Sequence, residues 1–203
     1  MTKPISTPVP WPHPRADLES ARRDDLVQLG VWMFLGTVVM LFAAFTSAYI
    51  IRRGASDWTP IALPWILWAN TAVLVASSLA IERGRRAMGS EDGEASARRG
   101  VSAAAGLGLL FLAGQTSAWR QLVDRGVYLP TSPHSSFFFV LTGTHAVHVA
   151  AGLLLVICAA ARMARVGGRT DRAAPRRLVT AAATFWHFLA ALWLYVMALV
   201  TVF

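Results

Sequence analysis

The sequence predicts an all-α fold, a polytopic membrane bundle of five transmembrane helices, from its composition and from its apolar stretches. Of 203 residues, 55% are hydrophobic and only 15% are charged, whereas soluble domains carry about 25% charged residues. Five long apolar stretches follow one another along the chain, and none has a charged residue in its interior. Because backbone polar groups must be bonded inside the hydrocarbon, these stretches are expected to be helices.

The chain divides into a polar segment and an apolar domain. Residues 1–25 are polar and rich in proline, which is typical of a segment without a packed core, and we expect a flexible cytoplasmic tail. Residues 26–203 are expected to form one transmembrane domain. Its helices are expected at about 26–51, 61–81, 101–119, 137–161 and 178–203. Each stretch is close to the roughly 20 residues that a helix needs to cross the hydrocarbon core.

The distribution of basic residues predicts the orientation. All but four of the 19 Lys and Arg residues lie in the tail, between the second and third stretches, or between the fourth and fifth. The exceptions are Arg52, Arg53, Arg120 and Arg125. Since cytoplasmic loops are the ones enriched in Lys and Arg, we expect the N-terminus in the cytoplasm and the C-terminus outside. The net charge of +8 is spread over short loops, which favours contact with anionic lipid over a nucleic-acid partner.

Polar side chains inside the five stretches are the candidate functional residues. Asn70 and Ser77 are seven residues apart and share a helix face. His145 and His148 are three residues apart and are adjacent on one face. Polar groups in hydrocarbon need partners, so we expect such residues to bond to neighbouring helices. The residues expected to tie helices together are Asn70, Ser77, Gln115, Thr144, His145, His148, Trp186 and His187.

The histidines allow two interpretations. Two histidines on one helix and His187 on another are a pattern that can ligate haem iron or a metal between helices. The same residues can instead form hydrogen bonds across helix interfaces. His134, in a predicted loop, is expected to be a plain surface residue. No stretch contains an interior carboxylate, so the chain alone is poorly equipped to move protons or ions.

Motifs in all five stretches match those of one known family. They are 30–35 and 40–42 in the first stretch, Trp68, Asn70, Thr71, Ser77 and Ser78 in the second, Gly114, Gln115 and Trp119 in the third, Thr142, Gly143, Thr144, His145, His148 and Val149 in the fourth, and Trp186, His187 and Phe188 in the fifth. With these motifs in this order, the chain resembles subunit III of the haem-copper oxidases, the family of cytochrome c and quinol oxidases.

The resemblance carries several expectations. It implies the short, five-helix bacterial form of the subunit, in the plasma membrane. It implies that this chain has no catalytic residue and binds no haem or metal, because the haem and copper lie in partner subunits I and II. It also implies bound phospholipid and a role in the stability and proton uptake of the catalytic subunit. The histidines then tie helices together instead of binding haem.

Three positions depart from the family pattern. Many members carry an acidic residue where this chain has Val38, Ala118 and Ala190, which favours a mostly structural role here. Two other functions stay open at this stage. One is an accessory subunit of a nitric oxide reductase, and the other, of a different class, is an independent small membrane cytochrome or transporter.

Overall fold

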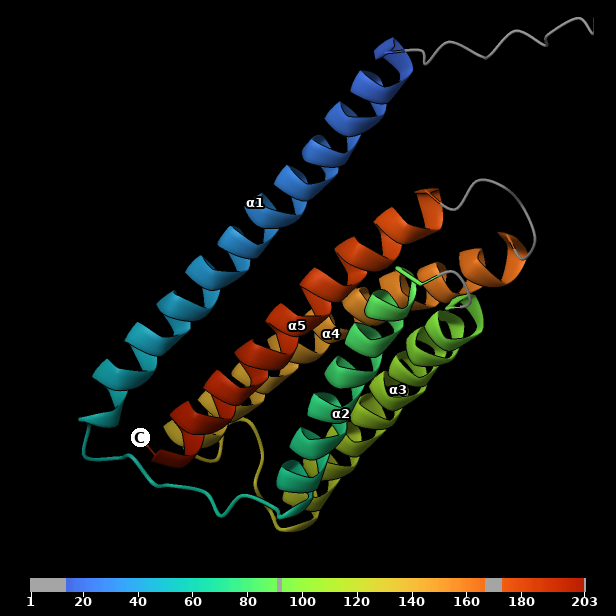
Figure 1. Cartoon of the computed structure of the whole chain (residues 1–203). Helices are drawn as coiled ribbons and strands as arrows, with labels where there is room; N and C mark the ends of the chain where they lie inside the picture. The colour runs from blue at the N-terminus through green and yellow to red at the C-terminus, as the bar shows by residue number, and fades with distance from the viewer. Residues whose placement is uncertain (1–13, 91–92, 167–172, 203) are drawn as a thin grey trace, which may run out of the picture.

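The computed structural model of the chain describes residues 14–90, 93–166 and 173–202, and within these ranges every regular element is a helix. The five helices are α1 (Pro14–Arg53), α2 (Ile66–Ala87), α3 (Glu94–Asp124), α4 (Pro133–Val166) and α5 (Ala173–Val202). They run side by side as a bundle (Figure 1). The predicted all-α fold with five helices is confirmed.

Four of the helices, α1, α3, α4 and α5, are long and apolar enough to cross a membrane. The second helix, α2, falls outside this group because its last turns carry Glu82, Arg83, Arg85 and Arg86. It nevertheless lies alongside α3, with which it makes the most extensive contact in the bundle. The chain is therefore a membrane protein in which a helix with a charged C-terminal end is packed against a helix that is long and apolar enough to cross the membrane.

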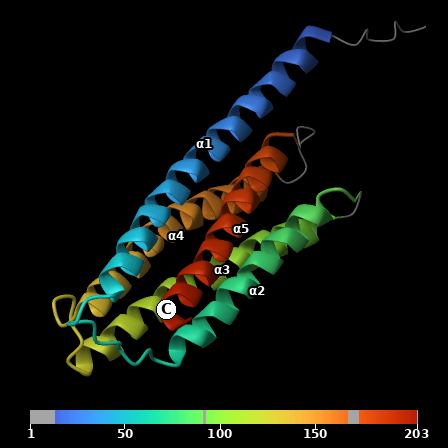
Figure 2. The same cartoon turned by 90° about the vertical axis from the view of Figure 1, so that its left-hand side faces the viewer.

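The helices form an antiparallel core of four, with α1 at its side. The helix α2 packs on α3 and α5, and α4 packs on α3 and α5. The first helix contacts only α4 and α5 to any extent, and it diverges from the core toward its N-terminal end (Figures 1 and 2). The N-terminal ends of α1, α3 and α5 and the C-terminal ends of α2 and α4 lie at one end of the bundle, while the C-terminal end of α5 lies at the other (Figure 1). The arginines of the described helix ends, among them Arg85, Arg98 and Arg165, therefore lie at a single end, as the predicted orientation requires.

All five helix starts differ from the predicted ranges. Helices α3, α4 and α5 begin four to seven residues earlier than predicted, at Glu94, Pro133 and Ala173, because their first turns are too polar to belong to an apolar stretch. The first helix begins at Pro14 instead of near residue 26, because 14–25 is rich in good helix formers and proline is well suited to a first helical turn. Residues 1–13 of the expected tail lie outside the described part. The second helix begins at Ile66 instead of residue 61, because Pro64 disfavours helical backbone at the residue before it and so prevents a helix from running through 61–63.

Glycines set the close approach of α2 and α3. A side chain at Gly100 would place its Cβ 2.7 Å from the Cα atom of Gly84 on the facing helix. A Cβ at Gly114 would collide with the side chain of Asn70. Small residues allow helix backbones to approach in a membrane, so these two glycines fix the spacing of the pair on which the polar contacts below depend.

Candidate functional site

Ser77 joins three helices. Its side chain is fully buried on α2, and its Oγ donates a hydrogen bond of 2.8 Å to the carbonyl of Ala104 on α3. The same Oγ accepts a bond of 3.0 Å from the indole Nε1 of Trp186 on α5. Two of the residues predicted from the sequence, Ser77 and Trp186, are thus in direct contact, and the hydroxyl is used as both donor and acceptor.

Two further hydrogen bonds join the N-terminal half of α2 to the same two neighbouring helices. The Nδ2 of Asn70 donates to the carbonyl of Phe111 on α3 at 3.0 Å. The indole Nε1 of Trp193 on α5 donates to the Oγ1 of Thr71 at 2.9 Å. Trp193 and Thr71 were not predicted as a pair, although Trp193 follows Trp186 by two helical turns, which is the signal that places both indoles on one face.

The third and fourth helices are joined by Trp119 and Thr142. The indole Nε1 of Trp119 donates to the Oγ1 of Thr142 at 3.1 Å. The sequence prediction named Trp119 only as part of a family motif and missed this bond. Thr144, which was predicted to join helices, instead provides its carbonyl to a 2.7 Å contact with Nδ1 of His148 within α4.

The two histidines of α4 face different neighbours. The ring of His148 lies 6.3 Å from that of Phe34 and 6.1 Å from that of Phe42, both on α1. The ring of His145 lies 6.1 Å from Phe111 on α3 and 5.1 Å from Trp193 on α5. The α4 histidines therefore connect α1 on one side and the α3–α5 core on the other.

Three buried side chains in the described part have a polar atom with no hydrogen-bond partner: Tyr49, Gln115 and His145. Gln115 is 1% exposed and His145 is 0% exposed. Neither nitrogen of His145 and neither polar atom of the Gln115 amide is bonded. The structure thus buries both of these predicted residues but pairs neither of them.

His187 belongs to a charged cluster at the end of α2. Its Nδ1 lies 2.5 Å from the Oγ of Ser78, and its Nε2 lies 3.3 Å from Oε2 of Glu82. Glu82 follows the predicted span and also accepts bonds of 2.7–2.8 Å from Arg85 and Arg86. These hydrogen bonds, that from Arg85 foremost, lower the pKa of the Glu82 carboxyl to about 2. The prediction missed Glu82, whose signal is an acid followed by arginines three and four residues later.

The three histidines that could ligate a metal or haem face different neighbours. His145 faces α3 and α5, His148 faces α1, and His187 faces α2. Within the described residues no three His, Cys, Asp or Glu side chains gather in a way that could hold a metal ion. What the arrangement does chemically is to join helices through hydrogen bonds and ring contacts.

The opposite end of the bundle carries an aromatic cluster around His134. His134 is 3% exposed, and its Nδ1 accepts a 2.9 Å bond from the backbone N–H of Ile61. Its ring lies 5.2 Å from that of Trp58 and 6.1 Å from that of Tyr49. The prediction of a plain surface residue is wrong, because the segment that precedes α2 folds back over the start of α4.

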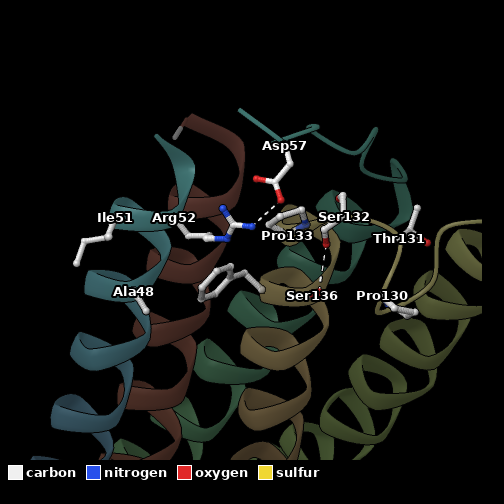
Figure 3. A pocket seen from close by; sticks show the side chains of 10 residues that line it. Ala48, Ile51, Arg52, Asp57, Pro130, Thr131, Ser132, Pro133 and Ser136 are labelled. Atoms are coloured by element: carbon white, nitrogen blue, oxygen red, sulfur yellow. Dashed lines mark hydrogen bonds and ion pairs between the residues drawn. The ribbon is translucent and has the colours of Figure 1, made fainter. Parts of the chain in front are cut away.

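An open cavity of about 850 Å³ lies beside this cluster, between the end of α1 and the start of α4. Its rim carries an exposed ion pair in which Arg52 Nη2 lies 2.6 Å from Asp57 Oδ2 (Figure 3). Ser132 and Ser136 line the opposite side. The cavity is therefore polar at its rim and apolar where Ile51 and Phe137 form its wall.

The fold and these contacts define a helical membrane protein whose buried polar groups bind its helices to one another. Comparison with known proteins identifies the family. The family model of cytochrome c oxidase subunit III matches residues 20–203. The cytochrome c oxidase subunit 3 of Synechocystis is 32% identical over 183 residues, covering 87% of this chain and 75% of the relative. The subunit 3 of Corynebacterium diphtheriae is 30% identical over 181 residues, covering 85% of each chain. The chain belongs to the cytochrome c oxidase subunit III family.

Proposed function

We propose that the chain serves as the subunit III of a respiratory haem-copper terminal oxidase of the cytochrome c oxidase type in a bacterial plasma membrane. It carries no redox centre, and the haem and copper of the complex lie in its partners, subunits I and II. Its role is to stabilise the catalytic subunit, to hold phospholipid beside it and to support its proton uptake. Family membership over residues 20–203 is the observation that carries this proposal.

The use of the polar side chains supports a structural role. Ser77, Asn70 and the two deep tryptophans of α5 bond from helix to helix. The lateral surface is in contrast apolar, and α1 exposes Trp32 and Met40 to 59% and 75%. A subunit that is held together internally and apolar at its sides is suited to pack against lipid and against other transmembrane helices.

The three positions without acidic residues limit how this chain supports proton uptake. Val38, Ala118 and Ala190 are all buried. An acidic side chain at these positions would lie inside the bundle, where carboxylates are costly and usually functional. Because this chain is apolar there, its support of proton uptake acts through the shape and lipid contacts of the complex rather than through carboxylates at these positions.

The open cavity at the end of α1 supports lipid contact. It combines an arginine and two serines with an apolar wall, and a phospholipid presents the same combination of a charged headgroup and apolar chains. Arg52 is already paired with Asp57, so a headgroup phosphate would have to share or replace that carboxylate.

Purification from native membranes tests the proposal. The tagged chain is extracted in a mild detergent and the proteins that accompany it are identified. Recovery with a haem-copper oxygen-reducing subunit is expected. Deleting the chain is expected to leave the haem spectrum of the complex intact while its activity decays faster during turnover. Recovery with a nitric oxide reductase subunit, recovery alone, or haem bound to the isolated chain would each overturn the proposal.

A further inference from the structure

The open cavity between α1 and α4 lies at the level of the headgroups on one side of the membrane. The apolar span of α1 ends at Arg53 and that of α4 begins at Pro133, and the cavity is lined by the last turn of the first and the first turn of the second. Trp65 and Trp68, at the start of α2 and at the same end of the bundle, are 74% and 58% exposed. Exposed tryptophans gather where the hydrocarbon meets the headgroups. A ligand therefore reaches this cavity from the membrane surface.

The rim of the cavity offers one positive and one negative group, and neither is fully used. Arg52 Nη2 donates a hydrogen bond of 2.6 Å to Asp57 Oδ2 (Figure 3). A guanidinium carries five N–H donors, however, and a carboxylate accepts with both of its oxygens. Within the described residues neither side chain makes another hydrogen bond, and the two are 44% and 57% exposed. A ligand can therefore bond to both groups without breaking the ion pair.

The serines of the cavity are already bonded to the backbone. Ser132 Oγ donates to the carbonyl of Thr59 at 3.2 Å, and Ser136 Oγ donates to the carbonyl of Leu129 at 2.6 Å. A hydroxyl has a single hydrogen to donate, so neither serine has one left for a phosphate. The ion pair is therefore the part of the cavity that selects the headgroup.

The ion pair discriminates between phospholipids by charge. A phosphoethanolamine headgroup carries a phosphate, which can accept from the remaining N–H groups of Arg52, and a primary ammonium, which can donate to the second oxygen of Asp57. Phosphatidylglycerol has a net negative charge and brings only neutral hydroxyls to that carboxylate. Ile51 and Phe137 form an apolar wall for the start of the acyl chains. The volume of about 850 Å³ lies within the range of about 300–1,000 Å³ that is usual for ligand sites.

We propose that the cavity at the end of α1 binds a zwitterionic phospholipid with an ethanolamine headgroup. Its phosphate is held by Arg52 and its ammonium by Asp57, while its acyl chains leave along Ile51 and Phe137. The inference rests on the lipid contact in the proposed function, and it specifies the place and the headgroup. All of these side chains belong to this chain, so the site can be absent while the chain still serves as an oxidase subunit.

Lipid binding to the complex purified with its partner subunits tests the selection of the headgroup. The complex is depleted of lipid in detergent and titrated with phosphatidylethanolamine or phosphatidylglycerol, and bound lipids are counted by native mass spectrometry. Arg52→Gln should weaken the binding of one phosphatidylethanolamine about tenfold. Asp57→Asn should weaken it as well but strengthen the binding of phosphatidylglycerol, because the repulsive carboxylate is gone. Arg125→Gln is the control, since Arg125 is exposed at the same end and outside the cavity, and it should change neither.

Photocrosslinking tests the place. Phosphatidylethanolamine with a diazirine at the start of one acyl chain should label the peptides that contain Ile51 and Phe137. Unlabelled phosphatidylethanolamine should compete, whereas water-soluble glycerophosphoethanolamine should not. Equal competition by phosphatidylglycerol, competition by glycerophosphoethanolamine, or labelling that is unchanged in Arg52→Gln would overturn the proposal. Recovery of the chain without an oxidase subunit would instead overturn the proposed function, and the same measurements on the recovered protein would still decide the lipid site.

Discussion

Removing the hydroxyl of Ser77 should lower the stability of the bundle by more than the loss of so small a group suggests. In Ser77→Ala the indole N–H of Trp186 loses its acceptor, while the carbonyl of Ala104 keeps its place in the helix of α3. Trp186 is fully buried, so its N–H cannot turn to water. An unsatisfied buried donor costs about 1–3 kcal/mol, and we expect Ser77→Ala to lower the free energy of unfolding by that amount.

The cost can be separated from a general effect of losing a serine. Ser117→Ala is the matched control, because Ser117 is exposed on α3 and bonds only to the carbonyl of Ala113 in its own helix. It should leave stability nearly unchanged. The assay is titration of the purified chain in bicelles with SDS, followed by circular dichroism, from which the free energy of unfolding of each variant is obtained.

A second background tests the role of the indole. In Trp186→Phe the donor is absent, so adding Ser77→Ala should then cost only about 0.6 kcal/mol, the typical value of an interhelical hydrogen bond in a membrane. Equal stability of Ser77→Ala and Ser117→Ala would refute the reasoning. So would an undiminished cost of Ser77→Ala in the Trp186→Phe background, because the indole would then not be the group that is left unbonded.

Three further predictions follow from other contacts. The pKa of Glu82 is lowered to about 2 from 4.5, so its contribution to stability is present above pH 4.5 and is lost as the pH falls toward 2; Glu82→Gln should flatten that part of a stability–pH curve measured by the same titration. Gly100→Leu should cost about 1–3 kcal/mol from overpacking against Gly84, whereas Gly106→Leu, where a side chain meets open space, should cost little. His134→Ala should release the segment before α2, since the Ile61 N–H loses its acceptor, and faster limited proteolysis of that segment would show it; unchanged cleavage would contradict it.

The fold was predictable because its signals are local. Each apolar stretch needs only its own length and composition to be recognised as a helix, and the excess of arginine in the tail and two loops predicts the orientation. The helix starts were less predictable. Pro64 delays α2 although the preceding residues are apolar, and 14–25 is helical although it is polar. Hydropathy marks the membrane rather than the helix, and the two differ wherever a helix leaves the bilayer.

The candidate residues were predictable as a set but not as pairs. Ser77 and Trp186 were both identified because polar groups in a span need partners, yet only the packing of α2 against α5 shows that they bond to each other. The pairs of Trp193 with Thr71 and of Trp119 with Thr142 were missed for the same reason. His134 was misplaced because its burial comes from a chain segment over 70 positions earlier in the sequence, a contact that no local pattern contains.

The bonds from α5 to α2 impose an order on how the protein is made. Ribosomal synthesis delivers α2 long before α5, so Ser77, Thr71 and Ser78 enter the membrane before the tryptophans and histidine that will bond to them exist. Until then α2, whose last turns carry four charged residues, has only α3 as a neighbour from the finished core. The newly inserted α2–α3 pair therefore still lacks the α5 partners of these three side chains, and arrival of the fifth helix completes the core.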